Sequence, residues 1–203
     1  MLKYFIEFFG TFLLVVALGI SGDPIAIGLI LAAFIYIGAD ITGGHFNPAV
    51  TLAAWAADEI PSSKISANIF SQLFGALAAS AFVWWISGTT FVTQPDPSTT
   101  LSGFIAVEFI FSFFFILVFL YFIYPNRRRR NPIYGILAGG VLGACYYITE
   151  PYTGVGLNPA LNLGYITADT INHGYSYYHL PVYLLTPLLG GLSAAFVHRK
   201  LSA

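Results

Sequence analysis

Two stretches of the chain decide its fold: GGHFNPAVTLA at Gly43–Ala53 and GVGLNPALNLG at Gly154–Gly164. Each sets an Asn-Pro-Ala triplet in glycine-rich, apolar surroundings, which indicates a repeated structural device rather than an accident. Asn is a good N-cap, and Pro is favoured at the first position of a helix because its missing N–H is not needed there. Each triplet therefore predicts the start of a helix, and the residues concerned are Asn47, Pro48, Ala49, Asn158, Pro159 and Ala160.

The composition is that of a membrane protein. Of the 203 residues 57% are hydrophobic and only 8% are charged, whereas a soluble domain carries about 25% charged residues. Such a chain has too little polar side chain to face water on all sides, so we expect it to lie in a bilayer. The single cysteine excludes an intrachain disulfide. The sequence contains no metal, nucleotide or nucleic-acid motif, so we expect no cofactor, no metal and no nucleic acid.

The apolar segments predict an all-α membrane protein. A spanning helix needs about 20 mostly apolar residues. Six apolar segments of the chain are long enough to span. Two others, 48–57 and 159–168, are too short, and each opens with an Asn-Pro-Ala triplet. We expect these two to form half-membrane helices. Gly135, Gly139 and Gly143 recur at four-residue spacing and predict a close helix–helix contact. The six predicted spans are 4–21, 25–41, 65–87, 102–124, 132–149 and 180–198.

The basic residues predict the orientation. With six spans, every Lys and Arg falls on one side of the membrane, and the loops near 22–24, 88–101 and 150–179 contain none. Cytoplasmic loops carry the excess of Lys and Arg. We therefore expect both termini in the cytoplasm, although the sequence does not say in which membrane. The basic residues are Lys3, Lys64, Arg127–Arg130, Arg199 and Lys200.

The chain also repeats itself. FIEFFGTFLLV at Phe5–Val15 is echoed by AVEFIFSFFFI at Ala106–Ile116, and each copy holds one Glu followed four residues later by a hydroxyl residue. Three spans per half is an odd number, so the second copy must enter the membrane from the opposite side, as an inverted repeat. We expect a single channel domain over residues 1–203, with repeat one at about 1–92 and repeat two at about 101–203.

Two inverted half-helices would bring their N-termini together near the midplane of the membrane. Each N-terminus carries roughly half a positive charge. Asn47 and Asn158 would then offer side-chain N–H donors to a passing solute, and the facing positive ends would repel cations. The repeated triplet thus predicts a polar, cation-repelling waist in an otherwise apolar pore.

These features together resemble the aquaporin, or major intrinsic protein, family over essentially the whole chain. The resemblance rests on EFFGT in the first span, on the two Asn-Pro-Ala stretches and on Glu108 in the fourth span. It implies that Glu7 and Glu108 brace the pore loops and that the protein is a homotetramer with one pore per protomer. We group His45 with the bracing residues, with pore lining as an equal alternative.

The chain departs from the family at the outer selectivity filter. Most members have Arg after the second Asn-Pro-Ala, and here that position is Leu161. By spacing from the two motifs, the other filter positions map to Ile27, Tyr146 and Val155. Without Arg the constriction loses a fixed charge and strong N–H donors. It then either dewets and slows water or is wide enough for larger neutral solutes.

The leading functional hypothesis is a passive channel for water and/or small uncharged solutes such as glycerol, surrounded by membrane lipid. The alternative is a non-conducting or weakly conducting structural membrane protein on the same scaffold, suggested by the apolar filter. An enzyme is not expected. GISG at Gly19–Gly22 matches the Gly-x-Ser-Gly pattern of intramembrane serine proteases. However, Ser21 falls in a turn outside the membrane, whereas His45 follows the second span on the cytoplasmic side.

Overall fold

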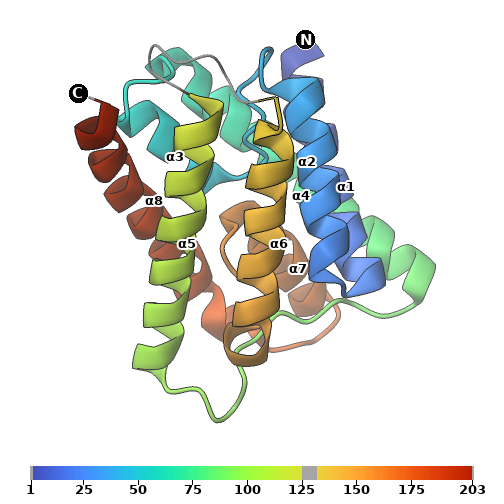
Figure 1. The fold of residues 1–203 in the computed structure, drawn as a ribbon. Helices are drawn as coiled ribbons and strands as arrows, with labels where there is room; N and C mark the ends of the chain where they lie inside the picture. Colours follow the sequence, from blue (N-terminus) through green and yellow to red (C-terminus); the bar gives the residue numbers. More distant parts are fainter. Residues whose placement is uncertain (1, 125–131, 203) are drawn as a thin grey trace.

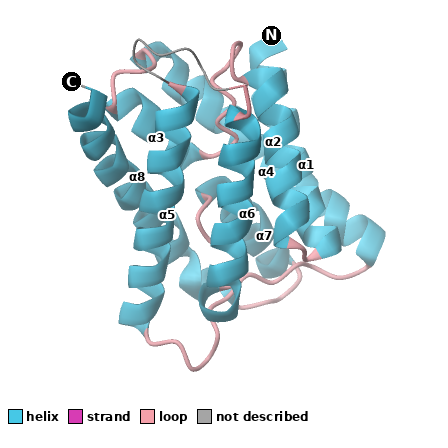
Figure 2. Ribbon diagram, viewed as in Figure 1, coloured by secondary structure: helices cyan, strands magenta, loops and turns pink. Residues whose placement is uncertain are grey.

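The computed structural model describes residues 2–124 and 132–202, and every regular element in these ranges is a helix (Figure 2). The predicted all-α fold is therefore confirmed. The basic run Arg127–Arg130 lies outside the described residues. The elements are α1 (Leu2–Ser21), α2 (Pro24–Gly38), α3 (Pro48–Ala56), η1 (Ser62–Lys64), α4 (Ile65–Ser87), α5 (Leu101–Ile123), α6 (Tyr134–Thr153), α7 (Pro159–Ile171), η2 (Ser176–His179) and α8 (Leu180–Ser202).

Six long helices and two short ones stand where the sequence predicts them. In the described residues, the helices of α1, α4, α5 and α8 are long and apolar enough to cross a membrane by length and composition. Helix α2 is apolar but has only 15 residues, since the chain turns at Gly38 toward Gly43 and Gly44, which adopt positive φ. Helix α6 runs past the predicted end at 149, because backbone bonding continues to Gly154.

The packing partners of the two halves follow the same order. Helix α1 packs on α4 and α2, just as α5 packs on α8 and α6. Half-helix α7 packs on α4, and half-helix α3 packs on α8, so each half contributes its short helix to the other half's last span. Helices α2 and α6, which occupy equivalent places in the two halves, pack on each other.

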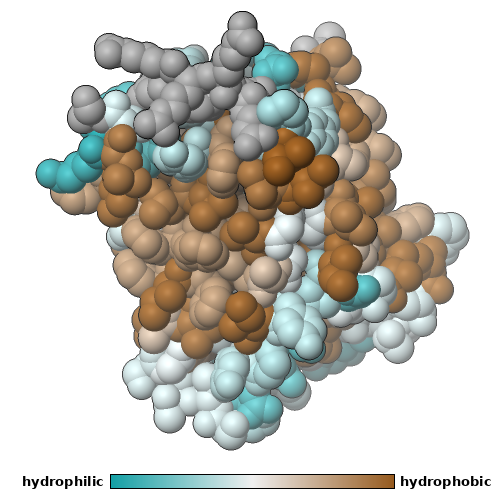
Figure 3. All heavy atoms as spheres, viewed as in Figure 1, coloured by the Kyte–Doolittle hydropathy of each residue, from teal (hydrophilic) through white to brown (hydrophobic). Residues whose placement is uncertain are grey.

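The molecule has an apolar belt and two polar ends. On the face drawn in Figure 3, hydrophobic residues form a broad band across the middle, and hydrophilic residues lie above and below it. Figure 1, in the same view, shows α3 in the upper part, α7 in the lower part and both chain termini at the top. This distribution fits a bilayer crossed by the long helices, with the two half-helices entering from opposite ends.

The contact between α2 and α6 depends on glycine. A Cβ added to Gly139 would collide with the Gly28 carbonyl, and one added to Gly143 would lie 2.9 Å from the Pro24 carbonyl. The predicted role of the glycine series therefore applies to a specific pair of helices. Small residues let backbones approach closely where no larger side chain fits.

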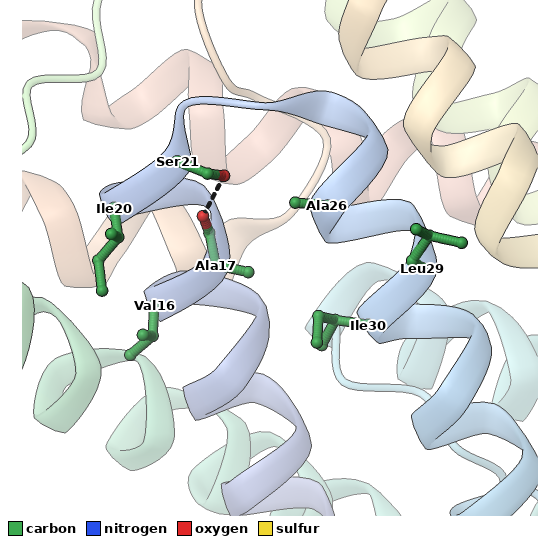
Figure 4. A pocket seen from close by; sticks show the side chains of 7 residues that line it. All are labelled: Val16, Ala17, Ile20, Ser21, Ala26, Leu29 and Ile30. Carbon is green, nitrogen blue, oxygen red and sulfur yellow. Dashed lines mark hydrogen bonds between the residues drawn. The ribbon is translucent and has the colours of Figure 1, made fainter.

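A shallow groove of about 410 Å³ lies between α1 and α2. Figure 4 shows the lining residues on its two sides, Val16 and Ile20 on α1 and Leu29 and Ile30 on α2. The one hydroxyl at its edge, on Ser21, donates to the carbonyl of Ala17 at 2.5 Å. The groove is thus an apolar surface between two spanning helices, suited to contact with lipid or protein.

Candidate functional site

The two half-helices begin in the same way. The side-chain oxygen of Asn47 accepts from Ala49 N at 2.8 Å, and that of Asn158 accepts from Ala160 N at 3.1 Å. A proline follows each Asn at the first helical position. The sequence fixes this geometry locally, because an Asn cap satisfies a free N–H and the proline has none to satisfy.

The same two side chains join the half-helices to each other. Asn47 Nδ2 donates to the Leu157 carbonyl at 2.9 Å, and Asn158 Nδ2 donates to the Phe46 carbonyl at 3.0 Å. Each accepting residue directly precedes the opposite Asn, so the N-termini of α3 and α7 meet. An amide nitrogen carries two hydrogens, and each Asn therefore has a second N–H besides the one used in this bond.

The residues before the two asparagines are strained. Phe46 has φ 51° and Leu157 has φ 62°, in the left-handed region that bulky side chains rarely adopt. Such a conformation costs about 1–3 kcal/mol and persists only where the surroundings hold it. Here a buried carboxylate holds each one: Phe46 N donates to Glu7 Oε2 and Leu157 N donates to Glu108 Oε2, both at 2.8 Å.

Glu7 has further partners. Its carboxylate also accepts from His45 N at 3.0 Å and from Gln72 Nε2 at 2.8 Å. Gln72 was not singled out in the sequence. The sequence signal is an amide inside a predicted span, which Gln72 shares with Asn68, and both side chains are buried. Among the described residues, by contrast, Glu108 Oε1 has no hydrogen-bond partner.

His45 is buried, and its ring bridges α3 and the residue that follows α5. Its Nδ1 lies 3.1 Å from Thr51 Oγ1, and its Nε2 lies 2.6 Å from the hydroxyl of Tyr124. Thr51 belongs to α3 and also accepts from Gln72 Nε2 at 2.9 Å. The sequence offered no signal for Tyr124, which follows α5 and reaches His45 only through the tertiary fold.

The four residues mapped to the filter are all buried and belong to one continuous apolar cluster. Ile27 comes from α2, Tyr146 from α6, Val155 from the loop before α7, and Leu161 from the first turn of α7. The Tyr146 hydroxyl donates to the Gly156 carbonyl at 2.9 Å. The one side-chain hydroxyl among these four residues is therefore bound to the adjacent loop.

The predicted outer loops carry acids and no bases. Asp96 accepts from the backbone N–H and the hydroxyl of Ser98 at 2.8 and 2.5 Å. These bonds favour the charged carboxylate and lower the pKa of Asp96 below its usual value. Asp23, which lies in another of these predicted outer loops, caps the start of α2. These loops thus hold carboxylates and no Lys or Arg.

Six spans, two inverted half-helices and paired Asn caps define a membrane channel of the aquaporin type. The major intrinsic protein family matches residues 2–198, and the chain belongs to this family. Family members are channels and not enzymes, so this chain is a transmembrane channel.

Similar proteins come from plants, bacteria and a protozoan. Nodulin-26 of Glycine max is 32% identical, over 96% of this chain and 73% of its own length. Glycerol uptake facilitator protein-like 6 of Lactiplantibacillus plantarum is 34% identical, over 100% of this chain and 99% of its own. The X-ray structure of the aquaglyceroporin from Plasmodium falciparum superimposes with a TM-score of 0.84 at 25% identity, covering 98% of this chain and 95% of that one.

Proposed function

We propose that the channel conducts water and small uncharged solutes such as glycerol, passively and in single file past Asn47 and Asn158. The observation that carries the proposal is the pair of Asn side chains at the meeting half-helix N-termini. Each is fixed by one bond to the opposite loop and has a second N–H for a solute oxygen. The names of glycerol uptake facilitator protein-like 6 and of the solved aquaglyceroporin support the same class of solute.

In this proposal Glu7, Glu108 and His45 brace the pore loops. Two carboxylates hold the strained residues that precede the asparagines, and His45 ties the first loop to α3 and to the end of α5. Facing helix N-termini place partial positive charge at the waist, which disfavours cations.

Ile27, Tyr146, Val155 and Leu161 form the outer selectivity filter in this proposal. Leu161 stands where most family members have Arg, so this filter has no fixed positive charge. The support for the assignment is that all four side chains are buried and that Tyr146 is bonded to the loop that holds Val155 and leads to Leu161.

We further propose a homotetramer with both termini in the cytoplasm and lipid around it. The apolar belt and the groove between α1 and α2 support contact with neighbouring protomers and lipid (Figures 3 and 4). The termini share one end of the molecule in Figure 1, and the loops of the predicted opposite side have no Lys or Arg.

Stopped-flow light scattering on proteoliposomes tests the proposal directly. Water and glycerol permeability are compared for the wild type, Leu161→Arg and the volume-conserving control Leu161→Met. Fast water or glycerol flux in the wild type is the expected result. Slow wild-type water flux that rises at least tenfold in Leu161→Arg, and not in Leu161→Met, would identify the filter as a hydrophobic barrier.

The competing function is a structural membrane protein that conducts little or nothing. The complete burial of Tyr146 and Leu161 favours it. Absence of water and glycerol flux in the wild type and in both variants, with the proteins folded in the liposomes, would reject the channel proposal for these solutes and support this alternative.

A further inference from the structure

Helix α8 and the short helix η2 before it carry one continuous apolar stripe of exposed side chains. The members recur every three or four residues, which is the spacing of a single helix face. A large exposed apolar surface with polar ends marks a site of contact with membrane or protein. The stripe consists of Tyr178, Pro181, Leu185, Leu189, Leu192 and Phe196.

One end of the stripe has the side-chain chemistry of a membrane–water boundary. Lys200 Nζ lies 5.1 Å from the centroid of the Phe196 ring, and Lys200 follows Phe196 by one helical turn. A lysine in this position lays its stem along apolar surface and keeps its ammonium in water. The hydrocarbon of a bilayer would therefore end close to Phe196.

The other end of the stripe carries three tyrosines, which we call the tyrosine cluster: Tyr175, Tyr177 and Tyr178. The rings of Tyr177 and Tyr178 lie 4.4 Å apart, those of Tyr175 and Tyr177 lie 6.4 Å apart, and all three side chains are exposed. Tyr178 precedes Phe196 by 18 positions. At a rise of about 1.5 Å per residue this separates them by about 27 Å, close to the hydrocarbon thickness of about 30 Å.

The chain that carries the tyrosine cluster is fastened on its inner side. The buried Asp169 carboxylate of α7 accepts from the backbone N–H of Ser176 at 3.1 Å and from its hydroxyl at 2.6 Å. A Cβ added to Gly174 would collide with that carboxylate. One turn further on, the Tyr183 ring packs edge-on against Phe104 of α5, with centroids 4.8 Å apart. The exposed rings therefore stand on a well-held support.

We propose that the tyrosine cluster is an anchor for the lipid headgroup boundary, which sets the depth of α8 in the bilayer together with Lys200 at the opposite end. A tyrosine ring has an apolar body and a polar hydroxyl, which suits the layer between hydrocarbon and water. Residues 172–179 contain no Asp, Glu, Lys or Arg, so this surface has no fixed charge with which to attract a charged soluble partner. The inference goes beyond the proposed function, since it does not depend on what the channel conducts.

Spin labelling in proteoliposomes measures the depth of the cluster. The single native cysteine, Cys145, is buried, so the wild type treated with the same reagent gives the background. The labelled variants are Tyr178→Cys in the cluster, Leu189→Cys in the middle of the stripe, and Pro97→Cys in the loop between α4 and α5, where Pro97 is exposed. The readout is the ratio of collisions with oxygen, which dissolves in lipid, to collisions with a water-soluble nickel chelate.

We expect the ratio at Tyr178→Cys to lie between those of the two other sites, about three- to tenfold above that of Pro97→Cys, because the boundary is where hydrocarbon begins. A ratio equal to that of Pro97→Cys would overturn the proposal, because the cluster would then lie in water. Few collisions with either reagent would also overturn it and would indicate that a second copy of the chain covers the cluster. Tyr175→Cys, at another exposed ring of the cluster, carries the same expectation if Tyr178→Cys does not fold.

A label at Leu185→Cys tests whether the rings themselves hold this depth. In that background, Tyr177→Ser with Tyr178→Ser removes two rings, whereas Tyr177→Trp with Tyr178→Trp keeps an amphipathic aromatic pair. We expect the oxygen-to-nickel ratio to fall about twofold with the serines, since polar side chains draw this end of α8 toward water, and to stay unchanged with the tryptophans. An unchanged ratio in the serine variant would overturn the anchoring role. Solute flux does not enter either measurement, so failure of the channel proposal would be seen separately.

Discussion

The two halves of the molecule begin with the same motif but hold it in different ways. In the first half, the Glu7 carboxylate accepts three hydrogen bonds, from His45 N, Phe46 N and Gln72 Nε2. In the second half, Glu108 accepts one bond, from Leu157 N, and its Oε1 is buried without a partner among the described residues. The equivalent glutamates of the two halves thus accept different numbers of hydrogen bonds.

The difference extends beyond the glutamates. The first loop continues through His45 to Thr51 and Tyr124, so a chain of bonds links α1, α3, α4 and the end of α5. The second loop is held by phenol hydroxyls on its carbonyls, from Tyr146 and Tyr183. An inverted repeat therefore conserves the backbone path while the side chains that hold it diverge, and the less constrained half is the one that carries the proposed filter.

The largest expected effect comes from replacing Glu7 by glutamine, with the same change at Glu108 for comparison. In Glu7→Gln both carboxylate positions face donors, so the new NH2 group opposes at least one buried N–H. An unsatisfied buried donor costs about 1–3 kcal/mol. In Glu108→Gln the amide nitrogen can take the place of Oε1 and the remaining oxygen still accepts from Leu157 N. We expect Glu7→Gln to lower the thermal unfolding midpoint in detergent clearly, and Glu108→Gln to leave it near the wild-type value.

Each variant is the other's control, since both change a fully buried carboxylate to an amide of the same shape. Equal losses in the two variants would mean that the halves are held equally well and that the orphan Oε1 has a partner in solution. A larger loss in Glu108→Gln would reverse the comparison.

A smaller effect is expected at the contact between α2 and α6, which occupy equivalent places in the two halves. Gly139→Ala places a Cβ against the Gly28 carbonyl, and overpacking of this kind costs about 1–3 kcal/mol, less the gain of about 1 kcal/mol from replacing a helical glycine by alanine. The neighbouring Gly140 has nothing within 4 Å of an added Cβ. We expect Gly139→Ala to lower the unfolding midpoint and Gly140→Ala to maintain or raise it, and a stable Gly139→Ala would show that the helices can separate without loss.

The sequence predicted the parts of this fold that depend on local chemistry. Asn followed by Pro determines a capped helix start wherever it occurs, and α3 and α7 begin at Pro48 and Pro159 as expected. Apolar runs located the six long helices within a few residues. The predicted boundaries differ at α2 and α6, because hydropathy counts apolar side chains, whereas a helix ends where its backbone hydrogen bonds end.

The contacts between distant residues were beyond the sequence. His45 was left between packing and pore lining because its partner Tyr124 is 79 residues away in the chain. Tyr146 was mapped to the filter by spacing alone, and the bond of its hydroxyl to Gly156 is visible only once α6 and the second loop are placed in space. One chain read alone also gives no sign that Glu7 and Glu108 differ in their number of partners.

The smallest effect is expected at the far end of the first-half network. Tyr124→Phe removes the hydroxyl that lies 2.6 Å from His45 Nε2 and leaves the contact of His45 Nδ1 with Thr51 and all three bonds of Glu7 in place. A typical hydrogen bond contributes about 0.5–1.5 kcal/mol, so we expect a drop of a few degrees in the unfolding midpoint. Tyr147→Phe, at an α6 tyrosine that is 73% exposed, serves as the control and should behave like the wild type. If Tyr124→Phe instead unfolds the protein as severely as Glu7→Gln, the first loop depends on the whole chain of bonds, and the stability of that half resides in the network rather than in the carboxylate.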